Sequence, residues 1–270
     1  MEDYIIGVIE EILNGVTSMG GDGGLLVQTP AQFNSAIYSW VQGICQSVAM
    51  PVAYIVLALI FTLELYNAST RIDGAEIVFK TMIKFVLCKL AVDMTPQILG
   101  AIFELSSNII GNISGGAPGT SVAADLDALR ASISGLNGIF PKLFLCLQVT
   151  IIWIVFKFSS MLITVVVIGR MVEIYIYTAI AAVPIATLGG GDLGMIGKNF
   201  LKSFAAVCVQ GVLIYIAMSM FGTLAVSIPS GGLAGGDVTG VLFQCLLYSL
   251  VLVMAVFSSG RLAKSICNAM

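Results

Sequence analysis

The chain has 270 residues, of which 58% are hydrophobic and only 10% are charged, and its net charge is −3. A typical soluble domain carries about 25% charged residues and has no means of hiding so much apolar surface, so a soluble globular fold is excluded. The small negative charge also excludes a global basic field for nucleic acid, and we expect an all-α, polytopic integral membrane protein.

The residue types that carry most enzyme chemistry are absent or widely scattered. The chain has no histidine, which removes Ser-His and Cys-His pairs, His general bases and imidazole metal ligands. The closest two of its six cysteines, Cys245 and Cys267, are 22 residues apart, so no CxxC redox or zinc spacing exists. We therefore expect no enzymatic activity, no cofactor and no metal site.

Residues 1–34 are predicted to form an amphipathic helix followed by a glycine-rich linker. Apolar side chains from Ile5 to Val16 share one helical face, while Glu11 and Asn14 lie on the other. This helix is too short to span a membrane and is expected to lie on its surface.

Residues 35–105 are predicted to form the first two transmembrane helices. No charged residue occurs between residues 25 and 63, and Pro51 is expected to divide this stretch into an approach helix and a first span at about 44–65. The second span, at about 77–105, is unusual because ionisable side chains occur along its length.

A stripe of polar side chains follows the second span. Lys89, Asp93, Gln97 and Glu104 lie within about 80° of arc when successive residues are placed 100° apart. Lys89 and Asp93 are i,i+4 neighbours and are placed to neutralise each other. Pro96 is expected to kink the helix beside them. Because ionisable groups are costly in lipid, the stripe is expected to face protein or a wet pore.

Residues 106–138 are rich in Gly, Ser and Asn and predict an extracytoplasmic polar loop, with a short helical piece near 122–132. A C-terminal transmembrane core is expected at 139–270. Its first span, at about 141–169, is apolar except for a polar seam on one face, formed by Thr150, Lys157, Ser160 and Thr164.

Lys157 is the most unexpected charge, because a lysine near the middle of a membrane helix costs about 2.5–3.5 kcal/mol unless something compensates it. One interpretation is a structural ion pair with a carboxylate of a neighbouring helix: Asp93, Glu104 or Glu173. Another is a wet pore or subunit interface that solvates the charge. A third is that the long side chain reaches the membrane surface.

Residues 174–190 are expected to re-enter the membrane or to lie buried within it. The segment follows Arg170 and Glu173, contains no charge and runs into a glycine-rich turn. A candidate hinge lies there, formed by Pro184, Gly189, Gly190 and Gly191. Two more spans are predicted at about 203–227 and 238–258, which makes five true spans.

The distribution of basic residues sets the predicted orientation. Lys and Arg cluster around Arg71, around Arg170 and Lys198, and around Arg261. If residues 174–190 return to the side that they left, all three clusters are cytoplasmic, so the N-terminus is outside and the C-terminus is in the cytoplasm. A full crossing by these residues, which makes six spans, is the alternative.

Two stretches of the second half resemble a known family. They are RMVEIYIYTAIAAVPIATLGGG (Arg170–Gly191) and GKNFLKSFAAVCVQGVLIYIAM (Gly197–Met218). Both resemble the TrbL-type polytopic channel proteins of type IV secretion systems, with the closest similarity to those of Gram-positive conjugative elements. Residues 35–110 are similar only as a helix pattern.

The resemblance implies a homo-oligomeric ring in the cytoplasmic membrane, surrounded by the lipid bilayer. Such a ring works with other secretion-system subunits, including separate ATPases, and contacts the transported DNA–protein substrate only transiently. The sequence agrees with separate ATPases, because it contains no G-x-x-x-x-G-K-[ST] phosphate loop.

Two other functions compete with this one. A secondary transporter would use Lys157, Asp93 and the broken segment 174–190 as a midplane site, yet no inverted repeat relates the two halves. An intramembrane aspartyl protease would use Asp93 and Asp192, since LGGGD contains GxGD. However, Val92 stands where that family has a tyrosine, and no PAL tripeptide follows. A channel or scaffold subunit of a secretion machine is therefore the predicted function.

Overall fold

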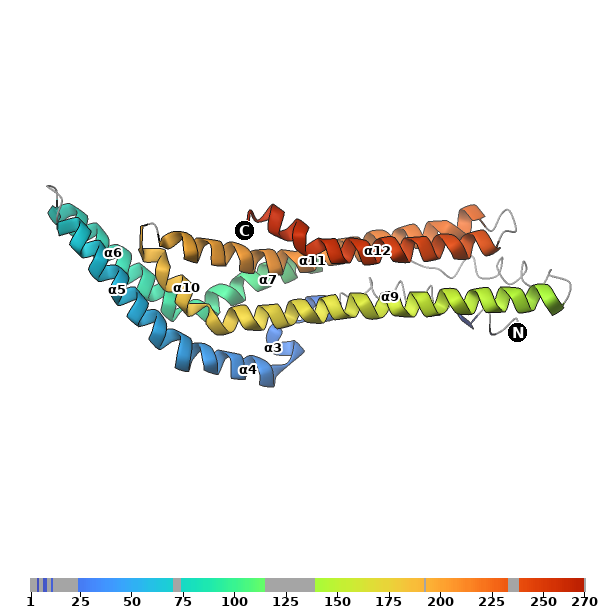
Figure 1. The fold of residues 1–270 in the computed structure, drawn as a ribbon, viewed down its shortest axis with the longest axis horizontal. Coiled ribbons are helices and arrows are strands. Elements are labelled where there is room, and N and C mark those ends of the chain that lie inside the picture. Colours follow the sequence, from blue (N-terminus) through green and yellow to red (C-terminus); the bar gives the residue numbers. More distant parts are fainter. Residues whose placement is uncertain are drawn as a thin grey trace. The chain divides into compact units, whose positions relative to one another are not determined.

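A computed structural model describes most of the chain: Tyr4, Gly7, Val8, Glu11 and residues 24–69, 74–114, 139–191, 193–232 and 238–269. Within these ranges every regular element is a helix (Figure 1). Most of the predicted polar loop at 106–138, including its helical piece, lies outside the described residues, as does Asp192.

The helices follow one another along the chain without an intervening strand in the described ranges. They are α2 (Gly24–Val27), α3 (Pro30–Phe33), α4 (Ser35–Ile44), the π-helical turn η1 (Cys45–Ala49), α5 (Met50–Ser69), α6 (Gly74–Asp93), α7 (Thr95–Ser114), α9 (Ile139–Ile180), α10 (Ala182–Ala186), the 3-10 turn η3 (Thr187–Gly189), α11 (Gly194–Gly232) and α12 (Val238–Ile266).

Four stretches of the described residues are long and apolar enough to cross a membrane: Ser35–Asn67, Leu143–Ile180, Gly194–Phe221 and Leu246–Ile266. A fifth is the pair α6–α7, if its two helices form one span with a 68° bend. Each of the five spans predicted from the sequence overlaps one of these stretches. The prediction of an all-α, polytopic membrane protein is confirmed.

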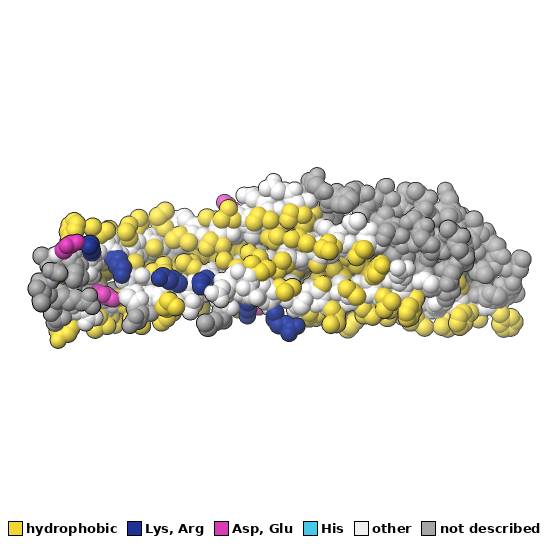
Figure 2. Space-filling view, turned by 90° about the horizontal axis from the view of Figure 1, so that it is seen from above, with side chains coloured by type: hydrophobic (Ala, Val, Ile, Leu, Met, Phe, Trp, Pro, Cys, Tyr) yellow, Lys and Arg dark blue, Asp and Glu magenta, His cyan; other side chains and the backbone are white. Residues whose placement is uncertain are grey.

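Large apolar side chains stay exposed along these helices. Ile55, Val86 and Met254, for example, are 63%, 63% and 73% exposed. Figure 2 shows apolar side chains spread over the coloured part of one face, with a row of Lys and Arg side chains among them. Soluble monomers rarely expose apolar surface so continuously, whereas lipid tails cover it without cost.

The described residues form two compact units. Unit 1 comprises residues 1–27, 109–168 and 212–259, and unit 2 comprises residues 28–108, 169–211 and 260–270. Each unit brings together segments that are far apart in the sequence, and each has its own apolar core.

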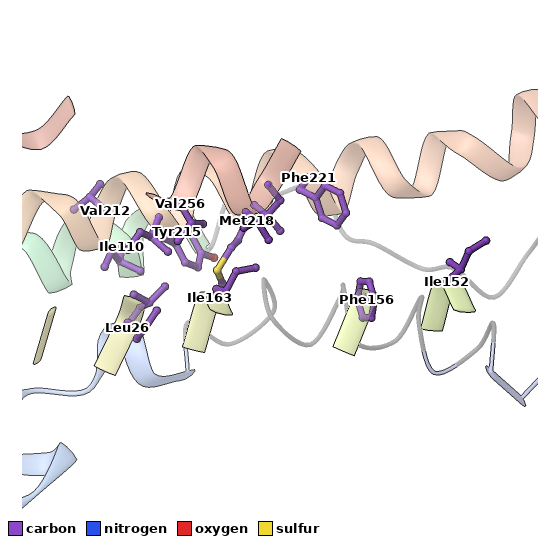
Figure 3. Close-up of a cluster of buried hydrophobic side chains, with 14 of the residues drawn as sticks. Leu26, Ile110, Ile152, Phe156, Ile163, Val212, Tyr215, Met218, Phe221 and Val256 are labelled. Carbon is purple, nitrogen blue, oxygen red and sulfur yellow. The ribbon is translucent and has the colours of Figure 1, made fainter. Parts of the chain in front are cut away.

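The core of unit 1 is built from long helices that carry apolar residues at helical spacing. Phe156 and Ile163 of α9 pack in one buried cluster with Tyr215 and Met218 of α11 and with Val256 of α12 (Figure 3). Residues three, four and seven positions apart share a helix face, so each helix presents one apolar stripe to its neighbours. Close packing of such stripes is what holds helices together in lipid.

The core of unit 2 surrounds a short helix. α5 and α6 pack against each other and against α10 and η3. Small side chains permit this close approach: Ala53 of α5 is buried, and so are Ala182 and Ala186 of α10. The later part of the predicted membrane-buried segment, Ala182–Gly189, therefore lies inside protein, where short helical pieces and turns are tolerated.

The interruption expected between the third span and residue 174 is absent. α9 continues for 42 residues from Ile139 to Ile180, through Arg170 and Glu173. Charged residues lower the local hydropathy, but they do not break a helix. Proline does, and the first proline after Pro141 is Pro184. The earlier part of the predicted segment is therefore the end of α9.

Pro51 does not divide its helix as predicted, because the irregularity lies just before it. The π-helical turn Cys45–Ala49 precedes α5, in which Pro51 is the second residue, and Ser35–Asn67 forms one candidate span. A π turn widens the helix where the proline ring would otherwise crowd the carbonyl four residues earlier.

The bend predicted at Pro96 is confirmed at the junction of α6 and α7. Proline has no N–H to donate to the carbonyl of Val92. The buried hydroxyl of Thr95 donates to that oxygen instead, at 2.8 Å. The bend is therefore built without leaving the carbonyl unsatisfied.

Candidate functional site

Lys89 and Asp93 of unit 2 form the ion pair that their spacing predicted. Lys89 Nζ lies 2.7 Å from Asp93 Oδ2. The hydroxyl of Tyr54 on α5 donates to Asp93 Oδ1 at 2.6 Å, and Lys89 Nζ is 6.0 Å from the centroid of the Tyr54 ring. Tyr54 was not predicted, because its 39-residue separation from Asp93 leaves no local signal.

The remaining stripe residues lie beyond the bend. Gln97 and Glu104 belong to α7, whose direction differs from that of α6 by 68°. Both side chains are exposed. The four residues therefore do not form one straight stripe, because a uniform 100° spacing assumed an unbroken helix.

Glu104 lines a cavity of about 180 Å³ in unit 2. The other lining residues are Thr29, Pro30, Ala31, Tyr38, Pro96, Leu99, Gly100, Phe103, Ile174, Thr178 and Phe204. Tyr175 of α9 holds one wall in place, because its hydroxyl donates to the carbonyl of Pro30 at 2.7 Å. Most of the lining is apolar, and Glu104 is its only ionisable carboxylate among the described residues.

Arg170 is the most unusual polar residue of unit 2. Its side chain is only 2% exposed, and none of its three guanidinium nitrogens has a hydrogen-bond partner in the part of the chain that the structure describes. The guanidinium carbon lies 5.9 Å from the centroid of the Phe103 ring. The sequence suggested a basic residue at a span boundary, whereas the structure buries it within the helices.

Gly211 of α11 makes room for this arginine. A Cβ atom at position 211 would overlap the guanidinium, with Nη1 and Cζ as its nearest neighbours. No local pattern marks the pair, because Arg170 and Gly211 lie on different helices.

Three of the four candidate hinge residues, the glycines, lie in a turn with close packing on several sides, and Pro184 belongs to α10 just before it. A Cβ atom at Gly189 would be 3.0 Å from the sulfur of Cys88, and one at Gly190 would be 3.1 Å from Ile60. The N–H of Gly191 donates to the carboxylate of Glu64 on α5 at 2.7 Å. Pro184 is half-buried beside them, and these contacts fix the turn to the α5–α6 hairpin.

Lys157 has a different partner from those expected. In unit 1 it forms an ion pair with Glu11 of the N-terminal segment, not with Asp93, Glu104 or Glu173. The second oxygen of Glu11 accepts a hydrogen bond from Trp153 Nε1 at 2.9 Å. The ammonium group also lies 5.6 Å from the Trp153 ring centroid. One carboxylate thus joins the N-terminal segment to two side chains one turn apart on α9.

The other residues of the polar seam bond within their own helix. The hydroxyl of Thr164 donates to the carbonyl of Ser160 at 3.0 Å, and that of Thr150 donates to the carbonyl of Cys146 at 2.8 Å. Glu173, which lies in unit 2, is exposed. The structure therefore groups Lys157 with Glu11, while the hydroxyls of Thr150 and Thr164 bond within α9.

Releasing Glu11 is expected to change the environment of Trp153. In a Trp40→Phe background Trp153 is the only tryptophan, so the tryptophan emission comes from this side chain alone. Glu11→Gln and Lys157→Met each remove one charge of the pair, and both should shift the emission maximum in the same direction. Glu173→Gln, an exposed glutamate of the same helix, is the matched control. Unchanged emission in the two test variants would contradict the contact.

The same contact predicts an acid transition. Hydrogen bonds from Lys157 and then from Trp153 hold the pKa of Glu11 below its ordinary value. A lowered pKa in the folded state means that the contact is fully formed above the ordinary pKa and is lost as the pH falls through the lowered one. Acidification should therefore shift the Trp153 emission maximum in the Trp40→Phe background. It should not do so when Glu11→Gln is added to that background.

The fold and these polar groups define a class: a multi-pass helical membrane protein with ionisable side chains in its membrane helices. The sequence matches the family described as TrbL/VirB6 plasmid conjugal transfer like protein over residues 16–182, which is more than half of the chain. The chain therefore belongs to the TrbL/VirB6 family and is a membrane component of a conjugal-transfer, type IV secretion machine. No curated protein and no solved structure matches it.

The matched region differs in extent from the resemblance carried by the two stretches of the second half. It includes residues 35–110, which were similar only as a helix pattern, and it ends at Ala182 at the start of α10. The stretch Gly197–Met218 lies outside it. The match therefore covers the Lys89–Asp93 pair, Arg170 and Lys157, but not Gly211.

Proposed function

We propose that several copies of this chain form a ring in the cytoplasmic membrane and take part in passing DNA–protein substrates outward. The observation that supports this proposal is that several polar side chains on the membrane helices are exposed. They are Lys84, Gln97, Glu104 and Glu173. Lipid does not solvate such groups, so they need cover from protein or from a water-filled pathway.

An assembly of copies supplies both kinds of cover. Residues at the interface between copies are sheltered by protein, and those that face a shared pathway are solvated by water. The energy for transfer comes from separate ATPases of the machine, because the sequence has no phosphate loop. A DNA–protein substrate would touch the pathway only during its passage.

The proposed orientation places the N-terminus outside and the C-terminus in the cytoplasm. Lys198 and Lys202 at the start of α11 are exposed, and so are Arg261 and Lys264 at the end of α12. A Cβ atom at Gly260 would lie 3.4 Å from Gln210 Nε2, so the end of α12 packs beside α11 within unit 2. Basic residues that lie together at helix ends favour the cytoplasmic side.

The contacts of Asp93 and Lys157 favour neither of the two competing functions. The transporter alternative needs Asp93 and Lys157 at one site, but each has a different partner. The protease alternative needs Asp93 beside a second carboxylate, and Asp93 is bound by Lys89 and Tyr54.

The orientation is tested by labelling intact cells with a membrane-impermeant thiol reagent. In a cysteine-free background, Ser121→Cys, in the predicted polar loop, is expected to react, and Lys264→Cys is expected to react only after lysis. The reverse result would overturn the orientation and leave the family membership unaffected.

The assembly is tested by measuring the mass of the purified protein in mild detergent. We expect a multimer, because a single copy leaves its polar side chains uncovered. A strictly monomeric protein that restores conjugative transfer to cells lacking the gene would contradict the ring.

A further inference from the structure

One cavity of unit 2 contains a carboxylate that has no counter-charge. Glu104 of α7 lines the cavity of about 180 Å³, and its side chain is exposed. The ion pairs of the described residues join other groups, so Glu104 has none there. A carboxylate on a membrane helix is costly unless a cation or water reaches it. The cavity therefore needs a positive group that the described part of its own chain does not supply.

The rest of the lining suits a cation on an apolar stem. Tyr38, Phe103 and Phe204 contribute aromatic side chains, and aromatic faces attract positive charge. The hydroxyl of Thr178 already donates to a carbonyl of α9 at 2.8 Å, so it offers a ligand only its lone pairs. Most of the other lining side chains are apolar. A carboxylate, an accepting hydroxyl and apolar walls together fit the ammonium group and the four-carbon stem of a lysine.

The basic residues of unit 2 differ in whether they are available. Lys80 and Lys89 are paired with acidic residues one turn away, and Arg170 is buried. Five others are exposed and form no ion pair within the described ranges: Lys84, Lys198, Lys202, Arg261 and Lys264. Of these, Lys202 is the nearest along the chain to a residue that lines the cavity.

Lys202 lies at the level of the cavity but on the opposite face of α11. It precedes the lining residue Phe204 by two positions, which is a rise of about 3 Å along the helix. Two positions also correspond to a turn of about 200°, so the two side chains leave α11 in nearly opposite directions. Phe204 is buried, whereas Lys202 is exposed. Each copy therefore presents the cavity and Lys202 on different sides at one level.

A ring of copies brings these two sides together. Its interfaces are head-to-tail, so they join two different surfaces of the same subunit. Rotation about the ring axis moves every residue to the place of its counterpart in the next copy without changing its depth in the membrane. Groups that meet across such an interface must therefore have similar depths, as Lys202 and the cavity do.

We propose that Lys202 of one copy enters the cavity of the neighbouring copy and forms an ion pair with Glu104 there. The stem of the lysine lies against the apolar and aromatic lining, and each charge gains the partner that it lacks in its own copy. The inference rests on the proposed ring and names one of its contacts. The partner copy thus completes a site that a single chain leaves open.

Carbodiimide treatment of native membranes tests this contact in the parent protein without removing either charge. The reagent joins a carboxylate to an amine that already touches it and adds no spacer. We expect a covalent dimer whose linked peptides contain Glu104 and Lys202. Lys202→Arg keeps the positive charge but has no amine to couple, so it should lose the link and remain a multimer. Glu173→Gln, which removes another exposed carboxylate of unit 2, should keep the link.

Three results of this experiment would overturn the proposal. The first is the absence of a link between Glu104 and Lys202 in the parent protein. The second is a link at the mass of a single chain, and the third is a link from Glu104 to a lipid amine or to another protein. A parent protein that is a multimer without the expected link keeps the ring and loses this interface, whereas a monomer loses both.

Charge exchange gives an independent measurement. Glu104→Lys sets two lysines against each other at every interface, and Lys202→Glu sets two glutamates, so each single variant should form fewer multimers than the parent. Combining them in one chain restores opposite charges and should raise the multimer yield about tenfold over either single variant. The matched control combines Glu104→Lys with Lys84→Glu, which reverses another exposed lysine of unit 2, and should recover nothing. Equal multimer yields from the two double variants would defeat the contact.

Discussion

Replacing Gly211 by alanine is expected to destabilise the protein by about 1–3 kcal/mol, because the new methyl group overlaps the buried guanidinium of Arg170. Glycine to alanine in a helix interior usually stabilises by up to about 1 kcal/mol, so the sign of the change is itself diagnostic. The measurement is the apparent Tm in mild detergent, followed as loss of monodisperse elution. Arg170→Ala in the same chain should relieve the overlap and restore part of the loss.

Gly169→Ala is the matched control for this prediction. Position 169 is also in a membrane helix, next to Arg170, but a Cβ atom there meets nothing within 4 Å. It should keep or raise the Tm. Equal Tm values for Gly211→Ala and Gly169→Ala would show that the guanidinium does not occupy the space beside α11.

Replacing Gly197 by alanine is expected to cost about 1–3 kcal/mol for a different reason. The added Cβ would lie 2.6 Å from the backbone carbonyl oxygen of Pro184 and 2.8 Å from the side chain of Leu188. A backbone oxygen does not move away as a flexible side chain does. The N–H of Gly197 also donates to the buried hydroxyl of Thr187 at 3.0 Å, so displacing α11 breaks that bond.

Gly43→Ala is the control for this variant, because a Cβ atom at that position of α4 meets open space. The same detergent melting experiment applies, with Thr187→Val as a second variant. We expect Thr187→Val and Gly197→Ala to lower the Tm together by less than the sum of their separate effects, since both loosen one contact. A Tm unchanged by Gly197→Ala would refute the close approach of α11 to the turn.

The glycine-rich turn of unit 2 packs closely against α5 and α6. The three glycines that the sequence suggested as part of a hinge lie against Cys88, Ile60 and Glu64. These contacts leave little room for the turn to move.

The features that the sequence predicted correctly depend on local physics. Long apolar runs identified the membrane helices, because spanning the bilayer requires about 20 apolar residues in succession. Spacing of four residues on a helix predicted the Lys89–Asp93 pair, and the missing N–H of Pro96 predicted the bend. Each of these needs only the residues within a few turns of the chain.

Only the tertiary structure decided which distant groups meet. Glu11 pairs with Lys157 across 146 positions, and Arg170 is buried against Phe103 and Gly211 from two other helices. In lipid, helix periodicity shows which face is apolar, but not which neighbour covers it, because the tails are as apolar as the side chains. The partners of Lys157 and Arg170 are therefore set by the packing of whole helices, which the spacing of residues along one helix does not contain.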